Sequence, residues 1–471
     1  MTHALGLLSL VPPLVAISLA FLTKRIIPSL LAGVFAAVVL LHLGQFWLAP
    51  FRTLDYMAKV ASDIENLELI AFSVVVGALL KLIRDANGFA TFAHTIERLR
   101  KNYGRGTVYG VTFTLSSVVF LECWSNILIS GTTMAPLYDR LGISRQRLAY
   151  FIHTIGLNIV AMVVINGWGA FYLSVLRAQN VSHPFNLIIS AMPFNLYSWI
   201  SLALVVVVMV TGLTIGPMKK FEAAAQLRET TSSIDAHELD DIVPPESATK
   251  PKLAYLFLPV ATLIVTMVTS LYSTGHGDIT RGDGSASILY AAALATGVLA
   301  VKLLIDRVYS FVEIEQKILA GMREFFDVSL LIVIALSLGG LCKDIGTGPY
   351  ISQIVQATLP TVLVPAMIFI GAAVMSFATG TSYGTLAIMV PIVLPMSAAT
   401  GLGAPLLFAA TLSGAIFGDN TSPINDNAII TSMASGATVL DHVRSQMPYA
   451  LIAATLSVIG FVILAAFRTS R

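Results

Sequence analysis

The sequence predicts an all-α integral membrane protein. We expect two inverted-topology repeats, each with about five transmembrane helices and one re-entrant hairpin, and broken helices at the membrane midplane. Of the 471 residues, 56% are hydrophobic and 11% are charged, whereas a soluble domain carries about 25% charged residues. Apolar runs of about 20 residues favour helices, because a membrane β-barrel would show alternating segments of about ten. The order of these runs is repeated in the second half.

Six apolar spans come first, at about 3–22, 26–48, 67–83, 106–136, 148–176 and 190–216. The N-terminal span lacks a basic start and is too long for a signal peptide, so we interpret it as the first membrane helix. The stretch 217–252 has charge, Ser/Thr and Pro but no apolar period, which predicts a linker. Further spans follow at about 253–273, 285–305, 325–342, 361–396, 404–430 and 447–467. We therefore expect a first repeat over 1–216 and a second over 253–471.

The two sets of spans correspond in order and relative length. Starts in the second half lie about 250–259 residues after their counterparts in the first half. At an offset of 255, Pro391 falls opposite Pro136, and the segment from Asn420 falls opposite the one from Ile165. Internal repeats of this size mark the binding architecture of many membrane transporters.

The distribution of Lys and Arg predicts the topology. They cluster in alternate loops, roughly 20 on one side against 7 on the other, and the richer side faces the cytoplasm. The loops alternate only if 106–136 and 361–396 do not cross, so each is predicted to be a re-entrant hairpin, one from each side. The linker 217–252 is then cytoplasmic, and the chain is multi-pass in the cell (inner or plasma) membrane. Amphipathic stretches near 51–62, 89–101, 309–323 and 349–358 are expected along the membrane surface.

Polar residues interrupt four of the apolar spans, at matching places in the two halves. Unpaired backbone in hydrocarbon costs several kcal/mol per group, so such breaks survive only where they line a cavity or are buried in protein. Carbonyl, hydroxyl, amide and carboxylate oxygens at these breaks suit Na⁺ or a similar cation, and hydroxyls and amides also suit a substrate carboxylate. We therefore predict a binding site near the midplane. The candidate residues are Glu122, Ser125, Asn126, His153, Asn158, Asn166, Thr379, Thr381, Ser382, Asp419, Asn420, Thr421, Ser422 and Asp426.

Each candidate also has a purely structural interpretation. Asp426 could cap the helix that follows it, and His153 could be a satisfied core histidine. The asparagines could form hydrogen bonds that only hold neighbouring helices together. Glu122 and Asp419 are functional by default, because ionisable groups inside a membrane are expensive. Residues Asp441, His442 and Arg444 are expected at the cytoplasmic surface, without a role in the site.

Other classes of protein are not indicated. The net charge of +2 comes without a basic tail, which gives no sign of nucleic-acid binding. The cysteines Cys123 and Cys342 form neither a disulfide framework nor a zinc motif, and no catalytic motif appears, so no enzyme and no cofactor is expected. A channel is disfavoured because twofold repeats with a mid-membrane site are typical of alternating access.

Several motifs resemble the NhaC family of Na⁺/H⁺ antiporters. They are "GDNTSPINDNAI" from Gly418 with "DHVRSQMPYA" from Asp441, "SFATGTSYGTLAIMVPI" from Ser376, and "SRQRLAYFIHT" with "INGWGAF" across Ser144–Phe171. The resemblance covers about 105–450. It implies inverted repeats, a homodimer, and elevator-like alternating access. The family pattern has paired acids in the first hairpin, where this chain has Glu122-Cys123-Trp124, and an acid where it has His153; Asp419, Ser422, Pro423 and Asp426 match.

Two functional hypotheses remain open. In the first, the protein is a Na⁺/H⁺ antiporter in which Asp419, Thr421 and Ser422 bind Na⁺, and Asp426 or Glu122 exchanges the proton. In the second, Na⁺ or H⁺ drives transport of a small organic carboxylate or amino acid, and the hairpin tips hold the substrate carboxylate. The coupling ions are Na⁺, H⁺ or both, and the expected partners are the lipid bilayer, a small cation and a small organic solute.

Overall fold

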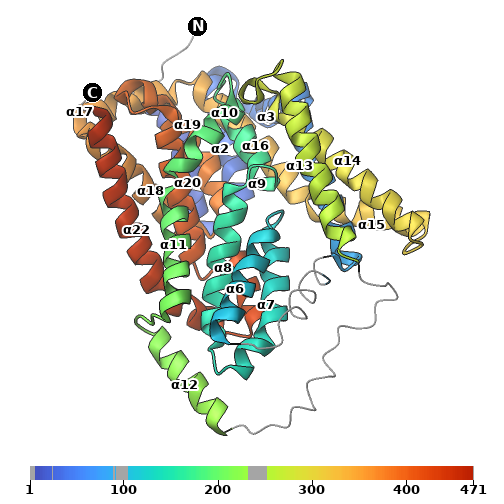
Figure 1. Cartoon of the computed structure of the whole chain (residues 1–471). Helices are drawn as coiled ribbons and strands as arrows, with labels where there is room; N and C mark the ends of the chain where they lie inside the picture. The colour runs from blue at the N-terminus through green and yellow to red at the C-terminus, as the bar shows by residue number, and fades with distance from the viewer. Residues whose placement is uncertain (1–5, 24, 89–90, 92–103, 232–251, 470–471) are drawn as a thin grey trace.

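The computed structural model describes residues 6–23, 25–88, 91, 104–231 and 252–469, and this part of the chain is helical without a strand. The first half contains α1 (Val11–Thr23), α2 (Ile26–Leu41), α3 (Ala49–Ser62), α4 (Ile64–Asp85), α6 (Arg105–Val118), α7 (Cys123–Arg140), α8 (Arg145–Met162), α9 (Gly167–Arg177), α10 (Pro184–Ala191), α11 (Leu196–Thr211) and α12 (Met218–Thr231). The second half contains α13 (Ala254–Thr274), α14 (Gly284–Ile305), α15 (Phe311–Glu324), α16 (Phe326–Asp344), α17 (Thr347–Thr358), α18 (Val364–Thr379), α19 (Ser382–Thr400), α20 (Ala404–Thr421), α21 (Asp426–Ser435) and α22 (Val439–Thr469). Short 3₁₀ turns join several of them (Figure 1).

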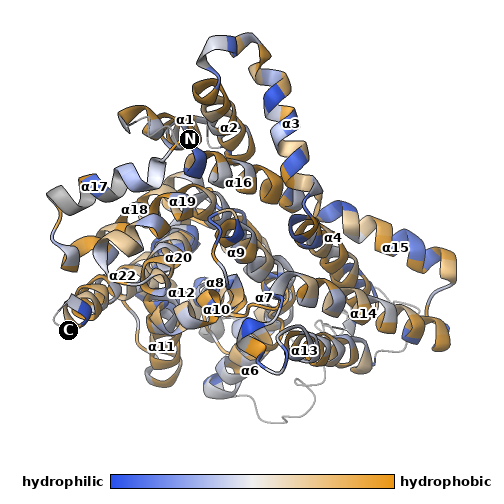
Figure 2. Cartoon of the chain, turned by 90° about the horizontal axis from the view of Figure 1, so that it is seen from above, coloured by the Kyte–Doolittle hydropathy of each residue, from blue (hydrophilic) through white to orange (hydrophobic). Residues whose placement is uncertain are grey.

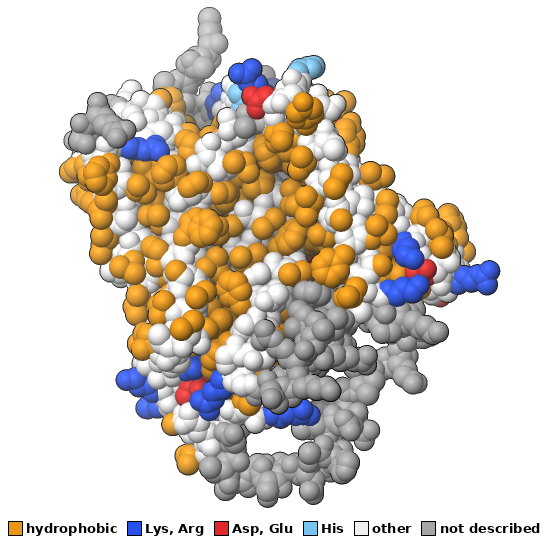
Figure 3. All heavy atoms as spheres, viewed as in Figure 1, with side chains coloured by type: hydrophobic (Ala, Val, Ile, Leu, Met, Phe, Trp, Pro, Cys, Tyr) orange, Lys and Arg blue, Asp and Glu red, His pale blue; other side chains and the backbone are white. Residues whose placement is uncertain are grey.

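The surface of the molecule is that of a membrane protein. Within the described residues, seven helices are long and apolar enough to cross a membrane, and up to nine if each bent pair counts as one span. Apolar side chains cover the middle of the face in Figure 3, with charged side chains toward its ends. Large apolar residues on α11 and α22, such as Val210 (80% exposed) and Phe467 (69% exposed), lie on this outer surface, where lipid would cover them.

Both predicted hairpins are pairs of helices separated by a short non-helical segment. In the first, α6 and α7 run antiparallel: Thr112 Oγ1 lies 3.1 Å from the Tyr138 hydroxyl and Ser116 Oγ lies 3.1 Å from Ser130 Oγ. In the second, α18 ends at Gly380, whose φ of +70° favours glycine, and α19 starts two residues later. The spans after the hairpins are broken too: α8 and α9 are bent by 48°, and α20 and α21 are separated by 422–425.

The order of elements recurs with one constant offset around the breaks. The starts of α6 and α18 differ by 364 − 105 = 259 residues, and the same difference separates α7 from α19, α8 from α20, and α9 from α21. The local offset of 255 expected from the sequence is therefore wrong by four residues, about one helical turn. In the correct register Pro136 corresponds to Pro395, and Asn166 to Asn425.

The first apolar pair is shorter than expected. α2 ends at Leu41, and the predicted span to residue 48 instead turns into a 3₁₀ segment with non-helical backbone at Gln45 (φ −144°, ψ 45°). The amphipathic helices α3 and α15 begin at or near the predicted positions, and hydrophilic residues recur along both in Figure 2. Helix α17 covers the predicted amphipathic stretch 349–358, and most of the stretch 89–101 lies outside the described residues.

The start of the predicted linker is a helix that packs on the first half. On α12, Met218 and Glu222 are one turn apart and buried at 1% and 6% exposure. The Glu222 carboxylate lies 3.3 Å from the Arg147 guanidinium and accepts a hydrogen bond from Ser144 Oγ at 2.5 Å. A buried, paired carboxylate fixes this segment in place, and residues 232–251 of the predicted linker lie outside the described ones.

A charged cluster joins the first two helices of the second half. Lys302 and Lys252 each approach the Asp306 carboxylate, at 2.8 and 2.9 Å, and the Tyr255 hydroxyl donates to it at 2.9 Å. These contacts lower the pKa of Asp306 below its usual range, with the hydrogen bond from Lys302 as the largest cause. The cluster holds the start of α13 against the end of α14.

Candidate functional site

The four breaks meet at one cavity, which we call the central cavity. It has a volume of about 100 Å³ and is also bounded by the junction of α15 and α16. Its walls carry four acidic side chains and several aromatic ones, and within the described residues they carry no Lys, Arg or His. The lining residues are Leu121, Glu122, Cys123, Trp124, Gly167, Trp168, Glu324, Phe325, Val328, Thr381, Tyr383, Asp419, Asn425, Asp426 and Asn427.

Glu122 is the N-cap of α7. Its Oε1 accepts from the Trp124 backbone N–H and its Oε2 from that of Ser125, both at 2.6 Å. A carboxylate at this position satisfies two amides of the first turn and opposes the positive end of the helix dipole. Glu122 thus has a structural role that the sequence interpretation did not anticipate, alongside its place on the cavity wall.

In each half, one asparagine joins the hairpin to the broken helix beside it. Asn166 caps α9 by accepting from Trp168 N and Gly169 N, and its Nδ2 donates to the Phe120 carbonyl of the first hairpin at 3.0 Å. Asn425 does the same in the second half: its Oδ1 accepts from Ala428 N at 3.2 Å, and its Nδ2 donates to the Gly380 carbonyl at 2.8 Å. Asn425 is absent from the predicted set, and the offset of 259 would have found it.

Asp419 of α20 connects the second hairpin with α21. It is 3% exposed. Its Oδ2 accepts from Ser382 Oγ of the second hairpin at 2.8 Å, and its Oδ1 accepts from Asn427 Nδ2 of α21 at 3.1 Å. Asp426 is the first residue of α21 and is exposed, and its Oδ1 accepts from the Asn427 backbone N–H at 2.8 Å. The second-half acids and Ser382 therefore lie together.

Other predicted residues direct their polar atoms to the protein itself. Thr421 and Thr379 each donate to a carbonyl of their own helix, at 2.7 and 2.8 Å. Asn126 Nδ2 donates to two carbonyls within the first hairpin, at 2.6 and 2.7 Å, and Asn420 Nδ2 donates to the Tyr197 hydroxyl at 3.0 Å. Ser125 is buried, and its backbone N–H donates to Glu122.

A second group of polar atoms is buried without a hydrogen-bond partner within the described residues. It includes the side-chain oxygens of Ser422 at the break of α20, Asn158 of α8, and Asn427 and Thr431 of α21. Asn158 Nδ2 donates to the Thr154 carbonyl at 2.7 Å, which leaves its Oδ1 free. A buried acceptor without a partner costs about 1–3 kcal/mol, so these oxygens are available to a bound cation.

His153 belongs to a buried pair that the sequence did not predict. Its Nδ1 lies 2.9 Å from Nε2 of His442 on α22, and both side chains are fully buried. Gln446, one turn further along α22, donates to the Asn420 carbonyl at the end of α20. The expectation of a surface position for His442 is wrong, because α22 begins at Val439 and turns this residue toward α8. The pair lies outside the lining of the central cavity.

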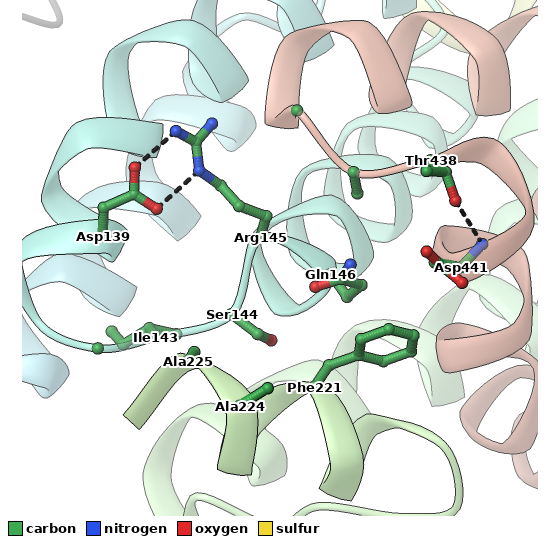
Figure 4. Close-up of a pocket in the computed structure, with 13 residues that line it drawn as sticks. Asp139, Ile143, Ser144, Arg145, Gln146, Phe221, Ala224, Ala225, Thr438 and Asp441 are labelled. Atoms are coloured by element: carbon green, nitrogen blue, oxygen red, sulfur yellow. Dashed lines mark hydrogen bonds and ion pairs between the residues drawn. The ribbon is translucent and has the colours of Figure 1, made fainter. Parts of the chain in front are cut away.

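A larger cavity, of about 680 Å³, lies elsewhere, between α12, the α7–α8 turn and the α21–α22 turn (Figure 4). Its polar groups are mostly paired: Arg145 forms an ion pair with Asp139 at 2.5 Å and donates to the Ser435 carbonyl. None of the four breaks lines it. We therefore take the smaller central cavity as the candidate site. Within the described residues, no cluster of three or more His, Cys, Asp or Glu side chains forms a metal site.

The fold and site define a membrane transporter with two helical hairpins and broken helices around a central cavity. The chain belongs to the Na⁺/H⁺ antiporter family, whose sequence model matches residues 162–466. The family and its relatives are transporters, so the protein is a secondary transporter and not an enzyme.

Three related proteins show how far the sequence similarity extends. An uncharacterized protein of Haemophilus influenzae is 27% identical over 97% of this chain and 90% of its own length. The malate-2H⁺/Na⁺-lactate antiporter of Bacillus subtilis is 30% identical over 32% of this chain and 34% of its own. The arginine/ornithine antiporter ArcD of Halobacterium salinarum is 27% identical over 46% and 42%.

Two solved structures share the fold. The YdaH transporter of Alcanivorax borkumensis, described as having an unusual topology, superimposes with a TM-score of 0.61 at 11% identity, covering 89% of each chain. MtrF of Neisseria gonorrhoeae, from a class of antimetabolite efflux pumps, gives a TM-score of 0.53 at 15% identity, covering 88% of this chain and 84% of MtrF. At these identities the similarity establishes the fold alone.

Proposed function

We propose that the protein is a cation-coupled antiporter that exchanges Na⁺ for H⁺ across the cell membrane. The observation that carries this proposal is the central cavity, where Glu122, Asp419 and Asp426 lie at the tips of broken helices and where no Lys, Arg or His of the described residues lines the wall. Intramembrane carboxylates mark ion pathways and proton relays. A carboxylate that binds a cation holds its proton less tightly, so Na⁺ and H⁺ compete for the site, and that competition is the coupling.

The proposed Na⁺ ligands include the predicted ones. Thr421 Oγ1 donates to its own helix, which leaves its lone pairs open to a cation, and the hydroxyl of Ser422 is buried without a partner among the described residues. We propose that Asp419, Thr421 and Ser422 bind Na⁺. The unpartnered oxygens of Asn427 and Thr431 would complete the set. Hard oxygen ligands of this kind suit Na⁺, and a bound ion would satisfy acceptors that otherwise remain unpaired.

The remaining expectations are part of the same proposal. Elevator-like movement would carry the hairpins and broken helices relative to α13 and α14, with the chain working as a homodimer. The named activity of the Bacillus antiporter includes both Na⁺ and H⁺, which supports coupling to these ions.

Cysteine labelling within 217–252 tests the orientation, and only labelling from the cytoplasmic side agrees with it. Light scattering of the purified protein tests the dimer.

The decisive experiment measures proton movement in liposomes that contain the purified protein and an internal pH-sensitive dye. A proton gradient is imposed and Na⁺, K⁺ or Li⁺ is added. We expect Na⁺-dependent proton movement in the wild type, its loss in Asp419→Asn, and no change in Asp55→Asn, an exposed acid on α3 paired with Lys59. Absence of Na⁺-dependent proton movement in the wild type would refute Na⁺/H⁺ exchange.

A second candidate function is coupled transport of a small organic solute. The size of the central cavity favours it, because about 100 Å³ exceeds the roughly 10–15 Å³ that one water molecule needs. The similarity to an arginine/ornithine antiporter also supports it. Solute-dependent uptake into the same liposomes separates this function from simple ion exchange.

A further inference from the structure

The helix starts at the central cavity are already occupied by the chain's own side chains. A helix N-terminus usually offers free N–H groups to an anion. Here Glu122 caps α7, Asn166 caps α9, Thr381 Oγ1 accepts from Gly384 N at 3.4 Å in α19, and Asn425 caps α21. A substrate carboxylate would therefore have to displace a cap at each of these positions, and at α7 it would meet a carboxylate.

The charged atoms on the cavity wall are carboxylate oxygens, beside neutral groups such as the Tyr383 hydroxyl and the indole N–H groups of Trp124 and Trp168. Glu122, Asp419 and Asp426 line it, and Glu324 lines it while paired with Arg84 of α4 at 2.7 Å. Independently, the side-chain oxygen of Asn427 has no hydrogen-bond partner in the described part of the chain, and this residue is 5% exposed. A buried, unpaired acceptor next to carboxylates calls for a ligand that donates hydrogen bonds and carries positive charge.

Aromatic side chains form another part of the wall. Trp124 is 46% exposed although it lies next to the cavity. Trp168 packs on Tyr383 with ring centroids 4.7 Å apart, and both line the cavity. In the register of 259, Trp124 and Tyr383 are equivalent positions of the two halves. Aromatic faces attract organic cations by cation–π interaction, and they also cover the apolar part of a solute.

We propose that the central cavity binds a small organic ammonium ion as the transported solute. The ammonium group donates to Asn427 Oδ1 and the neighbouring carboxylates, and the carbon chain lies against Trp124 and Tyr383. The volume of about 100 Å³ corresponds to about three water molecules at roughly 30 Å³ each, which suits a solute of a few non-hydrogen atoms. This inference rests on the proposed cation-coupled antiport and names the class of solute that it exchanges.

The experiment compares two probes of the same chain length and opposite charge, n-butylammonium and butyrate. Binding is followed by tryptophan fluorescence of the purified protein in lipid, because Trp124 and Trp168 both line the cavity. We expect saturable binding of n-butylammonium that Na⁺ weakens, and no saturable binding of butyrate. Trp124→Leu is expected to weaken binding of n-butylammonium about 3- to 30-fold, with Trp168 as the reporter.

Two further variants keep the test decisive. Trp124→Phe retains an aromatic face and should fall between the wild type and Trp124→Leu, which provides a second measurement if Trp124→Leu does not fold. Trp47→Leu, at a 61% exposed tryptophan outside the cavity lining, should bind like the wild type. Binding of butyrate as tight as that of n-butylammonium, or equal binding in all four proteins, would overturn the proposal.

The same liposomes separate this inference from the proposed function. Na⁺-dependent proton movement without any binding of n-butylammonium would refute the ammonium site and leave Na⁺/H⁺ exchange standing. Binding and exchange of n-butylammonium without Na⁺-dependent proton movement would support the ammonium site and refute Na⁺/H⁺ coupling.

Discussion

Asn425 offers the sharpest test of how the second hairpin is held. Its side chain both caps α21, at Ala428 N, and donates to the Gly380 carbonyl at the hairpin tip. Loss of an N-cap costs about 1 kcal/mol, and a buried carbonyl left without a partner costs about 1–3 kcal/mol. Asn425→Ala should therefore destabilise this junction by about 2–4 kcal/mol. Asn425→Ser keeps a capping oxygen and loses only the contact with Gly380, so it should cost about 1–3 kcal/mol.

The effect is local, so the assay must be local as well. Hydrogen exchange followed by mass spectrometry, on the protein in lipid, reports the opening of individual segments. A cost of 2–4 kcal/mol corresponds to about 30- to 700-fold faster exchange, which we expect in Asn425→Ala for peptides that cover the first turn of α21. Asn186→Ala, at an exposed asparagine on α10, serves as the control and should leave these peptides unchanged.

Two results would refute the reasoning. If Asn425→Ser exchanges like the wild type, the contact with Gly380 contributes nothing and the hairpin tip is held by other groups. If Asn425→Ala opens the first half as strongly as the second, the effect is global and the junction is not a separate unit. Asn166→Ala should have the larger effect of the two alanine variants, because its Nδ2 donates to two carbonyls, at 3.0 and 2.8 Å.

Three other predictions concern packing, the buried histidines and pH. A Cβ at Gly418 would lie 2.4 Å from the backbone of α18, so Gly418→Ala should cost about 1–3 kcal/mol in thermal unfolding and reduce transport. As the control, a Cβ at Gly110 meets nothing within 4 Å, so Gly110→Ala should be neutral or stabilising by up to about 1 kcal/mol. His442→Leu removes the partner of His153 Nδ1 and should lower the free energy of unfolding by about 1–3 kcal/mol. A double-mutant cycle of His442→Leu with His153→Leu should show coupling between the two positions, and additive costs would contradict a direct contact. Because the pKa of Asp306 is lowered in the fold, its two lysine pairs should stabilise the protein fully above about pH 4 and be lost as the pH falls further; unfolding measured against pH should show this loss, and Asp306→Asn should remove it.

Spans, hairpins and breaks could be predicted because their signals are local in the sequence. An apolar run of helical length, and a cluster of Gly, Pro, Asn and Asp within it, needs no knowledge of distant contacts. The end of α2 is the exception: the residues up to Leu48 are apolar enough for a span, yet the backbone leaves the helix near His42 and Gln45. Composition alone does not locate such a change.

The hydrogen-bond partners of the candidate site could not be predicted, because they depend on which side chains the fold brings together. The sequence makes Asn126 and Thr421 candidate ligands, but it does not show that nearby carbonyls accept their hydrogen bonds. His442 is buried against His153 across a separation of 289 residues. A single sequence gives no sign of that contact, since neither histidine lies in a spaced motif.

The offset of 259 residues between the two halves also shows where the halves of the site differ chemically. Ser382 and Asp419, which share a hydrogen bond, correspond to Cys123 and Val160, so the first half has an apolar pair where the second half has a polar one. The acid of the first half lies instead at the cap position, where Glu122 corresponds to Thr381. We infer that the second half supplies the groups that bind the coupling ion. The first half contributes the Glu122 carboxylate and the aromatic surface of Trp124 to the same cavity.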